Sequence, residues 1–245
     1  DNRTTAISES NYQYIKNNLN LKTKNFFCPC KKINLFFEDK EKIINFFNFK
    51  NKKKNLMYIF QNKDLKKTLD KIISKTKKIK MIKKNVDGVN NEKGFVRSAK
   101  KNIFYDLIIL SVGSRSKLYT KIEEGRSIEK NYKELALTAI IKHNTKVENV
   151  SQFFLKEGPL AVLPFQKKIF SIVWSVSSEF FSINKKKIKK ILNEKLKILL
   201  KTNNLKNVVN IKSFPINLNL KTKYFKKNVL ILGDGLHAVH PMAGQ

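Results

Sequence analysis

Residues 229–235 hold the feature that most constrains the fold. An apolar run, Val-Leu-Ile-Leu, leads directly into Gly233, Asp234 and Gly235. A glycine at this point lets the backbone turn sharply at the carboxyl end of a buried strand, where open α/β sheets bind their ligands. The carboxylate of Asp234 would then accept hydrogen bonds from sugar-like hydroxyl groups. The sequence predicts an α/β sheet with a ligand site at this strand end, and an ordinary strand-to-loop turn is the plain alternative.

A second apolar run, residues 103–112, also stops at a glycine, Gly113. A nearly continuous apolar stretch of this kind is typical of a parallel strand that is buried on both faces. Apolar periodicity predicts helices near residues 5–21, from about residue 63, and over residues 188–200. β-like patterns occupy residues 33–60, 79–89, 95–99 and 135–181. Strands flanked by helices, with a β-rich insertion, indicate an α/β or α+β chain in two intertwined parts.

The charge is strongly positive, with 51 Lys+Arg against 19 Asp+Glu and a net charge of +32. Nucleic-acid readers rely on arginine for bidentate contacts. This chain has only four arginines, Arg3, Arg97, Arg115 and Arg126. We interpret the charge as a solvated lysine-rich surface and expect no nucleic-acid partner, with a basic face toward anionic lipid or nucleic acid as the alternatives. No apolar run approaches the roughly 18 residues that a membrane span needs.

Cysteine and histidine offer little chemistry. Cys28 and Cys30 form a single C-x-C, which is neither a paired zinc motif nor a disulfide framework, so a reducing cytoplasm fits best. His237 and His240 are three residues apart, but no third ligand follows with suitable spacing, so we predict no metal site. No Ser-His-Asp or Cys-His arrangement stands out, and we predict no catalytic side chain.

The string that follows residue 232 carries a resemblance. Residues 233–245 read Gly-Asp-Gly-Leu-His-Ala-Val-His-Pro-Met-Ala-Gly-Gln. They resemble the late flavin motif of the FAD-dependent aromatic hydroxylases of ubiquinone biosynthesis, relatives of para-hydroxybenzoate hydroxylase. That motif is a strand, then Gly-Asp-Ala-Ala-His, two variable residues and His-Pro-x-Ala-Gly-Gln. Here Gly235 and Leu236 replace the two alanines.

Four other segments resemble the same family in the same order. Residues 1–8 are similar to its Asp-x-Arg-x-x-Ala-Leu/Ile-Ser, and residues 57–65 to its Gly-Tyr-Val-Val-Glu-Asn-x-x-Leu. Residues 158–164 and 170–175 are similar to two strands of its substrate domain. The resemblance implies that Arg3 meets the FAD pyrophosphate, that Asn62 faces the flavin nucleotide and that Asp234 holds the ribityl hydroxyls. The implied cofactor-binding residues are Arg3, Asn62, Gly113, Gly233, Asp234, His237, Pro241, Gly244 and Gln245.

Two departures from the family pattern stand out. The middle motif is Ala-Asp-Gly-x-x-Ser-x-x-Arg, whereas residues 111–119 have Val112 in the Asp position and Tyr119 in the Arg position. Loss of that carboxylate would weaken the use of NAD(P)H more than it would disturb the fold. In addition, the chain contains no G-x-G-x-x-G, the motif that cradles a pyrophosphate at a helix N-terminus. We interpret the chain as an internal piece of a longer enzyme, truncated at both ends, or as a decayed copy.

The resemblance implies a Rossmann-like FAD-binding domain interleaved with a mixed β-sheet substrate domain. The FAD domain would comprise residues 1–27, 61–121 and 228–245, and the substrate domain residues 28–60 and 122–227. The implied activity is hydroxylation of the aromatic ring of a polyprenylated ubiquinone precursor, with FAD as cofactor and NAD(P)H and O2 as co-substrates.

Such a polyprenyl-phenol substrate lies in the membrane. We therefore expect a cytoplasmic protein with peripheral association at the inner membrane face, and participation in a quinone-biosynthesis complex. The main alternative is a degenerate, non-catalytic flavoprotein-like partner in that complex. A basic nucleic-acid-binding protein is the remaining alternative.

Overall fold

The structure is a computed structural model that describes residues 3–19, 26–40, 42–113, 116–119, 127–144, 147–206, 208 and 210–239. The chain divides into two compact units. Unit 1 comprises residues 1–75, 133–215 and 241–245, and unit 2 comprises residues 76–132 and 216–240. Two strands, β10 (Ser127–Lys142) and β14 (Lys212–Lys221), contribute residues to both units. Each unit is described below by itself.

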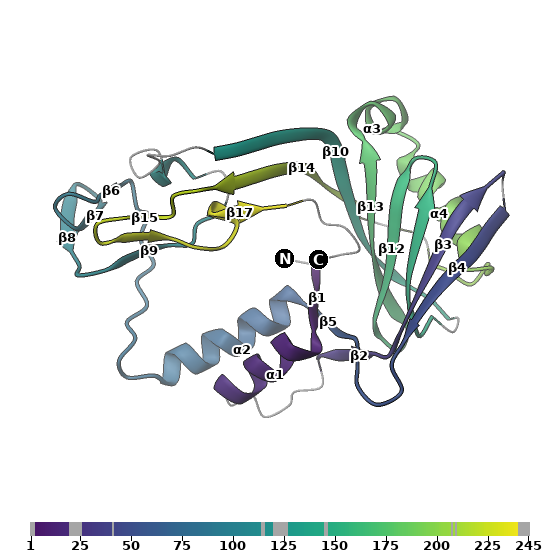
Figure 1. Cartoon of the computed structure of the whole chain (residues 1–245), viewed down its shortest axis with the longest axis horizontal. Helices are drawn as coiled ribbons and strands as arrows, with labels where there is room; N and C mark the ends of the chain where they lie inside the picture. Colours follow the sequence, from purple (N-terminus) through teal and green to yellow (C-terminus); the bar gives the residue numbers. More distant parts are fainter. Residues whose placement is uncertain are drawn as a thin grey trace. The chain divides into compact units, whose positions relative to one another are not determined.

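A large mixed sheet forms the centre of unit 1 (Figure 1). Its strand order is β17-β14-β10-β13-β12-β11-β3-β4, where β17 (His237–Ala238) belongs to unit 2. The remaining strands are β3 (Lys32–Asp39), β4 (Lys42–Lys50), β11 (Val150–Leu155), β12 (Gly158–Gln166) and β13 (Ile169–Ser177). β3 pairs in parallel with β11, whereas β11, β12, β13 and β10 pair with one another antiparallel. The predicted mixed sheet is therefore confirmed.

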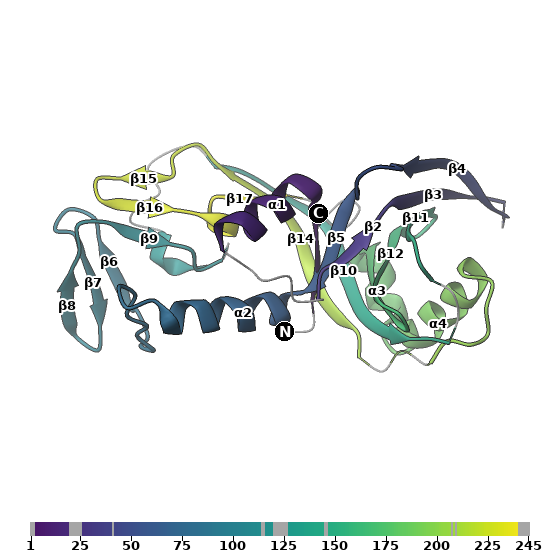
Figure 2. The same ribbon diagram turned by 90° about the horizontal axis from the view of Figure 1, so that it is seen from below.

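Two helices, α3 (Ser178–Asn184) and α4 (Ile188–Leu199), lie on one face of this sheet (Figure 2). The hydroxyl oxygen of Ser177 accepts a hydrogen bond from the Phe180 amide and caps α3, which fixes where that helix begins. α4 buries Ile188, Leu192 and Leu196 in a core that includes the fully buried Trp174. Each such side chain contributes about 1.5–3 kcal/mol when it leaves water. Trp174 is thus a core residue, as its position at a strand centre predicts.

An ion-pair cluster also links α4 to the sheet. Lys195 Nζ lies 2.9 Å from a carboxylate oxygen of Glu157 and 4.0 Å from one of Glu38. Glu38 also accepts a hydrogen bond from the backbone amide of Lys156. All three charged side chains are largely buried, so the cluster holds the helix against the β3 and β11–β12 region.

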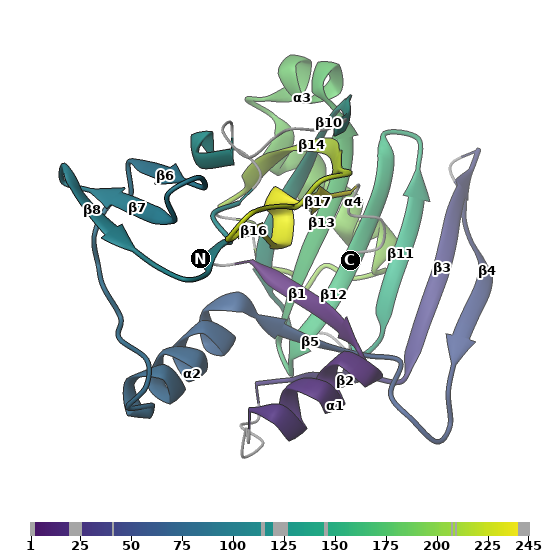
Figure 3. The same ribbon diagram turned by 60° about the vertical axis from the view of Figure 1, so that its left-hand side comes forward.

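A small sheet of order β1-β5-β2 packs on the opposite face of the large sheet (Figure 3). Its strands are β1 (Thr4–Ser8), β5 (Met57–Gln61) and β2 (Cys28–Cys30), and the helices α1 (Glu9–Asn18) and α2 (Asn62–Lys75) follow β1 and β5. The predicted helix over residues 5–21 is corrected here. Its first residues pair with β5, and Ser8 caps the helix so that it begins at Glu9.

Unit 2 contains two further small sheets. One is the meander β6 (Gly88–Asn90), β7 (Phe95–Ser98) and β8 (Lys101–Phe104), and the other has the order β15-β16-β9. The second sheet is built from β15 (Phe225–Lys226), β16 (Val229–Ile231) and β9 (Ile108–Leu110). Two 3-10 turns, η1 (Lys117–Tyr119) and η2 (Gly233–Gly235), accompany it. Buried residues of this sheet, of β6 and of η1 together form a separate core: Val89, Ile108, Leu110, Tyr119, Val229 and Ile231.

Two predictions for unit 2 need correction. Of the strand expected over residues 79–89, only the end is in β6, and the exposed residues 79–87 form neither helix nor strand. The single strand expected over residues 103–112 is divided into the end of β8 and the short β9. Ile109 is 52% exposed, so β9 buries one face and not both. Apolar composition alone does not report this alternation, because both faces carry apolar residues.

Candidate functional site

The sequence predicts a ligand site where the carboxyl ends of β9 and β16 lie. The two strands are parallel neighbours, with Ile108 opposite Val229 and Leu110 opposite Ile231. The Leu232 amide donates to the Leu110 carbonyl at 2.9 Å, which extends the pairing by one residue. After each strand the backbone turns at a glycine, Gly113 after β9 and Gly233 after β16. The predicted parallel strands therefore end side by side, in the arrangement that open α/β sheets use for ligands.

The two glycines have backbone conformations that favour glycine. Gly113 has φ of +80° and Gly233 has φ of +69°, both in the left-handed region. No atom of the described residues lies within 4 Å of a Cβ atom placed on Gly113, and a Cβ atom on Gly233 would lie 3.4 Å from Ser111 Oγ. The backbone at this edge is therefore accessible, and it leaves room for a ligand to approach closely at Gly113.

Asp234 lies on η2, immediately after the β16 strand. The Leu236 amide donates to the Gly233 carbonyl at 2.9 Å and closes this short turn. The Asp234 side chain is exposed, and among the described residues none donates a hydrogen bond to its carboxylate. Its acceptor capacity is thus available to ligand hydroxyls. His237 follows on β17, exposed and opposite Leu220 of β14.

The buried Tyr119 side chain packs against the backbone that follows β9 and β16. The sequence interpretation missed this role. The side chain is 1% exposed, and its hydroxyl oxygen accepts a hydrogen bond from the Val112 amide at 3.3 Å. A Cβ atom on Gly235 would lie 2.1 Å from that hydroxyl oxygen. Tyr119 therefore occupies the space that an alanine at position 235 would need. Val112 and Gly235 both contact Tyr119, so three positions that depart from the family pattern meet at this side chain, and the sequence alone does not display these contacts.

Arg3 and Asn62 lie in unit 1 and are brought together there. The Asn62 amide donates to the Arg3 carbonyl at 2.9 Å, and Thr5 Oγ1 donates to Asn62 Oδ1 at 2.6 Å. The Arg3 guanidinium lies 5.7 Å from the centre of the Phe214 ring. These residues form one group, and Gly113, Gly233, Asp234 and His237 form a second group in unit 2.

Three predicted residues, Pro241, Gly244 and Gln245, lie outside the described residues, as does His240. Val112 is 51% exposed at the position where the family has an aspartate. An apolar side chain there leaves the edge with one carboxylate, Asp234, where the family pattern has two.

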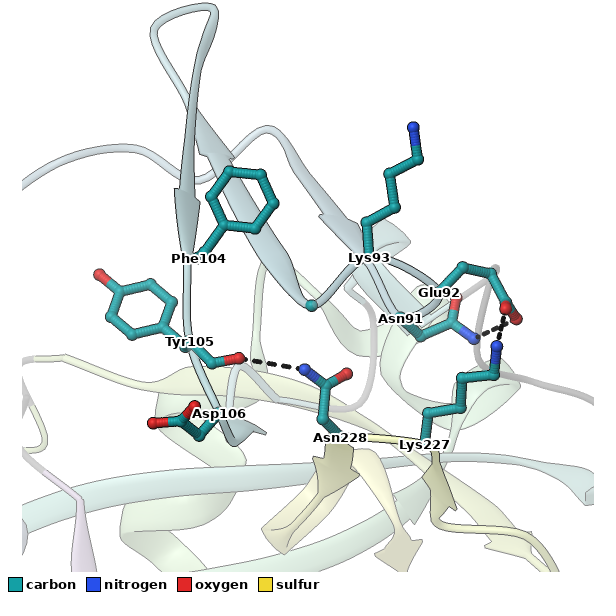
Figure 4. A pocket seen from close by; sticks show the side chains of 9 residues that line it. Asn91, Glu92, Lys93, Phe104, Tyr105, Asp106, Lys227 and Asn228 are labelled. Carbon is teal, nitrogen blue, oxygen red and sulfur yellow. Dashed lines mark hydrogen bonds and ion pairs between the residues drawn. The ribbon is translucent and has the colours of Figure 1, made fainter.

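A hollow of about 410 Å³ lies at the other, amino-terminal ends of β9 and β16 (Figure 4). Lys227 and Glu92 form an ion pair there, and Asn228 Nδ2 donates to the Tyr105 carbonyl at 3.1 Å. The full lining is Asn91, Glu92, Lys93, Gly94, Phe104, Tyr105, Asp106, Lys227 and Asn228. These contacts connect the β6–β7–β8 meander to the turn between β15 and β16, so the hollow has a structural explanation.

Cys28 and Cys30 lie on β2 in unit 1, and both are free thiols. Burial raises the pKa of the Cys28 thiol above its ordinary value of 9.0, and Cys30 adds to the shift. A raised pKa disfavours the reactive thiolate. Within the described ranges, no three His, Cys, Asp or Glu side chains gather as a metal cluster. None of the described helices is long and apolar enough to cross a membrane.

Comparison with curated proteins finds similar sequences in ubiquinone biosynthesis. The chain is 27% identical over 157 residues to the mitochondrial ubiquinone biosynthesis monooxygenase COQ6 of Xenopus tropicalis and to that of Homo sapiens. Each match covers 49% of this chain and 34% of the relative, so the chain spans about a third of these relatives. No family model matches the chain. The resemblance inferred from the motifs is thereby confirmed at the level of sequence similarity.

Solved structures show the same fold over the whole chain. PqsL of Pseudomonas aeruginosa, described as a probable FAD-dependent monooxygenase, superposes with a TM-score of 0.81 at 14% identity, covering 100% of this chain and 72% of that one. The myxobacterial halogenase CndH superposes with a TM-score of 0.77 at 13% identity, covering 97% and 60%. The chain therefore has the fold of the FAD-dependent monooxygenases and halogenases, and the predicted fold class is confirmed.

Proposed function

We propose that this chain is part of a FAD-dependent monooxygenase that hydroxylates the aromatic ring of a polyprenylated ubiquinone precursor. NAD(P)H would be the reductant and O2 the co-substrate. One observation carries the proposal most directly: β9 and β16 end side by side in left-handed glycines, next to the unengaged carboxylate of Asp234. Sequence similarity to proteins named ubiquinone biosynthesis monooxygenases supports the choice of substrate class.

The residues of this edge fit a flavin nucleotide. The open space at Gly113 admits a ligand against the backbone, and Asp234 would accept hydrogen bonds from the ribityl hydroxyls. In unit 1, Arg3 would meet the pyrophosphate and Asn62 would face the nucleotide, while Thr5 orients the Asn62 amide. Pro241, Gly244 and Gln245 would lie beside the isoalloxazine ring, and His237 in the loop leading to it. Bound FAD would supply the redox chemistry, while the protein binds the ring, orients it and excludes water.

The substrate class explains where the protein would work. A polyprenylated phenol partitions into the bilayer, so an enzyme that acts on it must reach the membrane surface. We therefore propose peripheral association at the inner membrane face, and membership of a quinone-biosynthesis complex. The division into FAD-binding and substrate-binding domains at the predicted boundaries is part of the same proposal.

A non-catalytic relative is the second candidate, and the exposed Val112 favours it. An aspartate at this position is expected to assist both FAD and the nicotinamide donor, and valine has no polar atom to replace it. In this form, the protein would keep the fold and act by stabilising a partner hydroxylase.

The test is FAD binding by the complete product of the gene that encodes this segment. Replacing Asp234 by alanine removes hydrogen bonds to a charged acceptor, each worth about 1.5–3 kcal/mol, and should weaken FAD binding at least tenfold. Asp106→Ala is the matched control, because Asp106 is also exposed but precedes β9 at the opposite end of the same sheet. Equal FAD affinity in the two variants would contradict the assignment. Hydroxylated phenol formed from NAD(P)H and O2 would separate the enzyme from its non-catalytic alternative.

A further inference from the structure

Six large apolar side chains are exposed together at one edge of the large sheet, where β3, β4 and β11 lie side by side (Figure 3). Between 38% and 50% of the surface of each is exposed. We call this set the aromatic edge patch: Phe37, Ile44, Phe46, Phe47, Phe49 and Phe154. A contiguous exposed apolar surface of this kind indicates an interaction site.

The strand register places these side chains on a single face. Phe37 is opposite both Ile44 of β4 and Phe154 of β11, so the three side chains point the same way. Phe47 and Phe49 are opposite Leu35 and Ile33, which alternate with Phe37 along β3 on that face.

Ring contacts join the bulged residue of β4 to the same patch. The Phe46 ring centre lies 5.9 Å from that of Phe37 and 6.1 Å from that of Phe154. Phe36 and Phe153, the sequence neighbours of two patch residues, point to the other face and pack in the core under α4. The aromatic edge patch is therefore on the face opposite α3 and α4, the face against which the small sheet of β1, β5 and β2 also packs.

Exposed lysines lie at both ends of the strands that carry the patch. Lys40 and Lys42 flank the β3–β4 turn, and Lys50 ends β4. A lysine run, Lys52 to Lys54, follows β4, and its backbone is fixed because Asn51 Oδ1 accepts from the amides of Lys53 and Lys54 at 2.9 and 3.0 Å. We call these lysines, which lie at the two ends of the apolar patch, the lysine rim.

We propose that the aromatic edge patch docks this protein on an anionic lipid bilayer. The phenylalanine rings would enter the region between headgroups and acyl chains, and the lysine rim would lie against the negative headgroups. A second copy of the chain is the less suitable occupant. Pairing two β4 edges would bring two lysine rims together in a protein of net charge +32.

This inference deepens the proposed function and rests on it for the reason why a membrane is needed. An enzyme held by this edge would meet a polyprenylated phenol where that phenol resides. Vesicle binding is measured without flavin or turnover, so docking and the proposed activity can fail separately.

The experiment measures binding of the complete gene product to vesicles of phosphatidylcholine alone and of phosphatidylcholine with phosphatidylglycerol. The triple variant Phe46→Ser, Phe47→Ser, Phe49→Ser should lose binding about 100-fold to the anionic vesicles, since each half-exposed ring contributes about fivefold on insertion. The control is Ile183→Ser with Ile198→Ser, which removes the more exposed apolar side chains on α3 and α4. This control should bind as the wild type does.

A second pair of variants tests the charge. Replacing Lys52, Lys53 and Lys54 by glutamine should reduce binding to anionic vesicles more than tenfold, because each lysine near such a surface contributes about fivefold. Binding to phosphatidylcholine alone should change little. The matched control neutralises another exposed lysine run, residues 185–187, between α3 and α4.

Unchanged vesicle binding in the phenylalanine variant would overturn the proposal. So would a phenylalanine variant that turns a dimer into a monomer in sedimentation while its vesicle binding is unaffected, because the occupant would then be a second copy. Equal loss in both lysine variants would also contradict it, since the effect would be one of total charge and not of this edge.

Discussion

Replacing Gly235 by alanine tests the packing beneath the candidate site. The new Cβ atom would lie 2.1 Å from the Tyr119 hydroxyl oxygen, 2.4 Å from Cζ and 2.9 Å from Cε2. The Tyr119 side chain is only 1% exposed, so its ring cannot move aside without displacing the core residues around it. The Val112 amide, which donates to the same hydroxyl, would lose its partner if the ring shifted.

The expected cost follows from this geometry. Inserting a methyl group into a well-packed core costs about 1–3 kcal/mol. Tyr119→Leu removes the three ring atoms nearest Gly235, so Gly235→Ala should be nearly neutral in that background. Tyr119→Phe removes only the hydroxyl and keeps Cζ, so the cost should persist there. The coupling energy between positions 235 and 119 should therefore be about 1–3 kcal/mol with leucine and much smaller with phenylalanine.

The assay is urea unfolding of the complete gene product and its variants, with hydrogen exchange of peptides from residues 108–113 and 229–236. Gly235→Ala should lower the unfolding free energy and speed exchange in both peptides. An equal cost of Gly235→Ala in the wild-type and Tyr119→Leu backgrounds would refute the contact between the two positions.

Three further outcomes are expected. Lys195→Met leaves two glutamates together without their cation and should lower the free energy of unfolding in urea by about 1–3 kcal/mol. Lys190 lies on the same helix with its side chain 80% exposed, so Lys190→Met should change that free energy by less than about 0.5 kcal/mol. Gly158 has φ of +126°, and a Cβ atom there would lie 2.1 Å from a backbone carbonyl oxygen. Gly158→Ala should therefore lower the free energy of unfolding by more than about 2 kcal/mol, and a wild-type urea midpoint would contradict the strand geometry. The raised pKa of Cys28 favours the neutral thiol in the folded state, so its contribution to stability is present below pH 9.0 and is lost as pH rises above it. Iodoacetamide should accordingly label Cys28 more slowly than a free thiol at pH 8, and equal rates would contradict the burial.

Much of the fold follows from sequence because its signals are local. Leu65, Leu69 and Ile72 recur at helical spacing and α2 forms over them, while the apolar run before Gly233 becomes β16. The paired ends of β9 and β16 were predictable because each run stops at a glycine. The family motifs begin at this same end of the sheet.

Other features depend on contacts that one sequence does not display. Whether Tyr119 is a surface replacement for an arginine or a buried support depends on Gly235, more than a hundred residues away. The alternation of β9 was hidden because Ile109 is as apolar as its buried neighbours. The exposed aromatic edge patch was missed for the same reason, since alternating phenylalanines predict a strand equally well whether a partner covers them or not.

The ratio of flavin to protein, measured by visible absorbance of the complete gene product, tests the central claim most directly. The account predicts one FAD per chain, with a lower ratio in Asp234→Ala and an unchanged ratio in Asp106→Ala. A colourless protein that also fails to bind added FAD would contradict the flavin site at the ends of β9 and β16, and would leave only the fold.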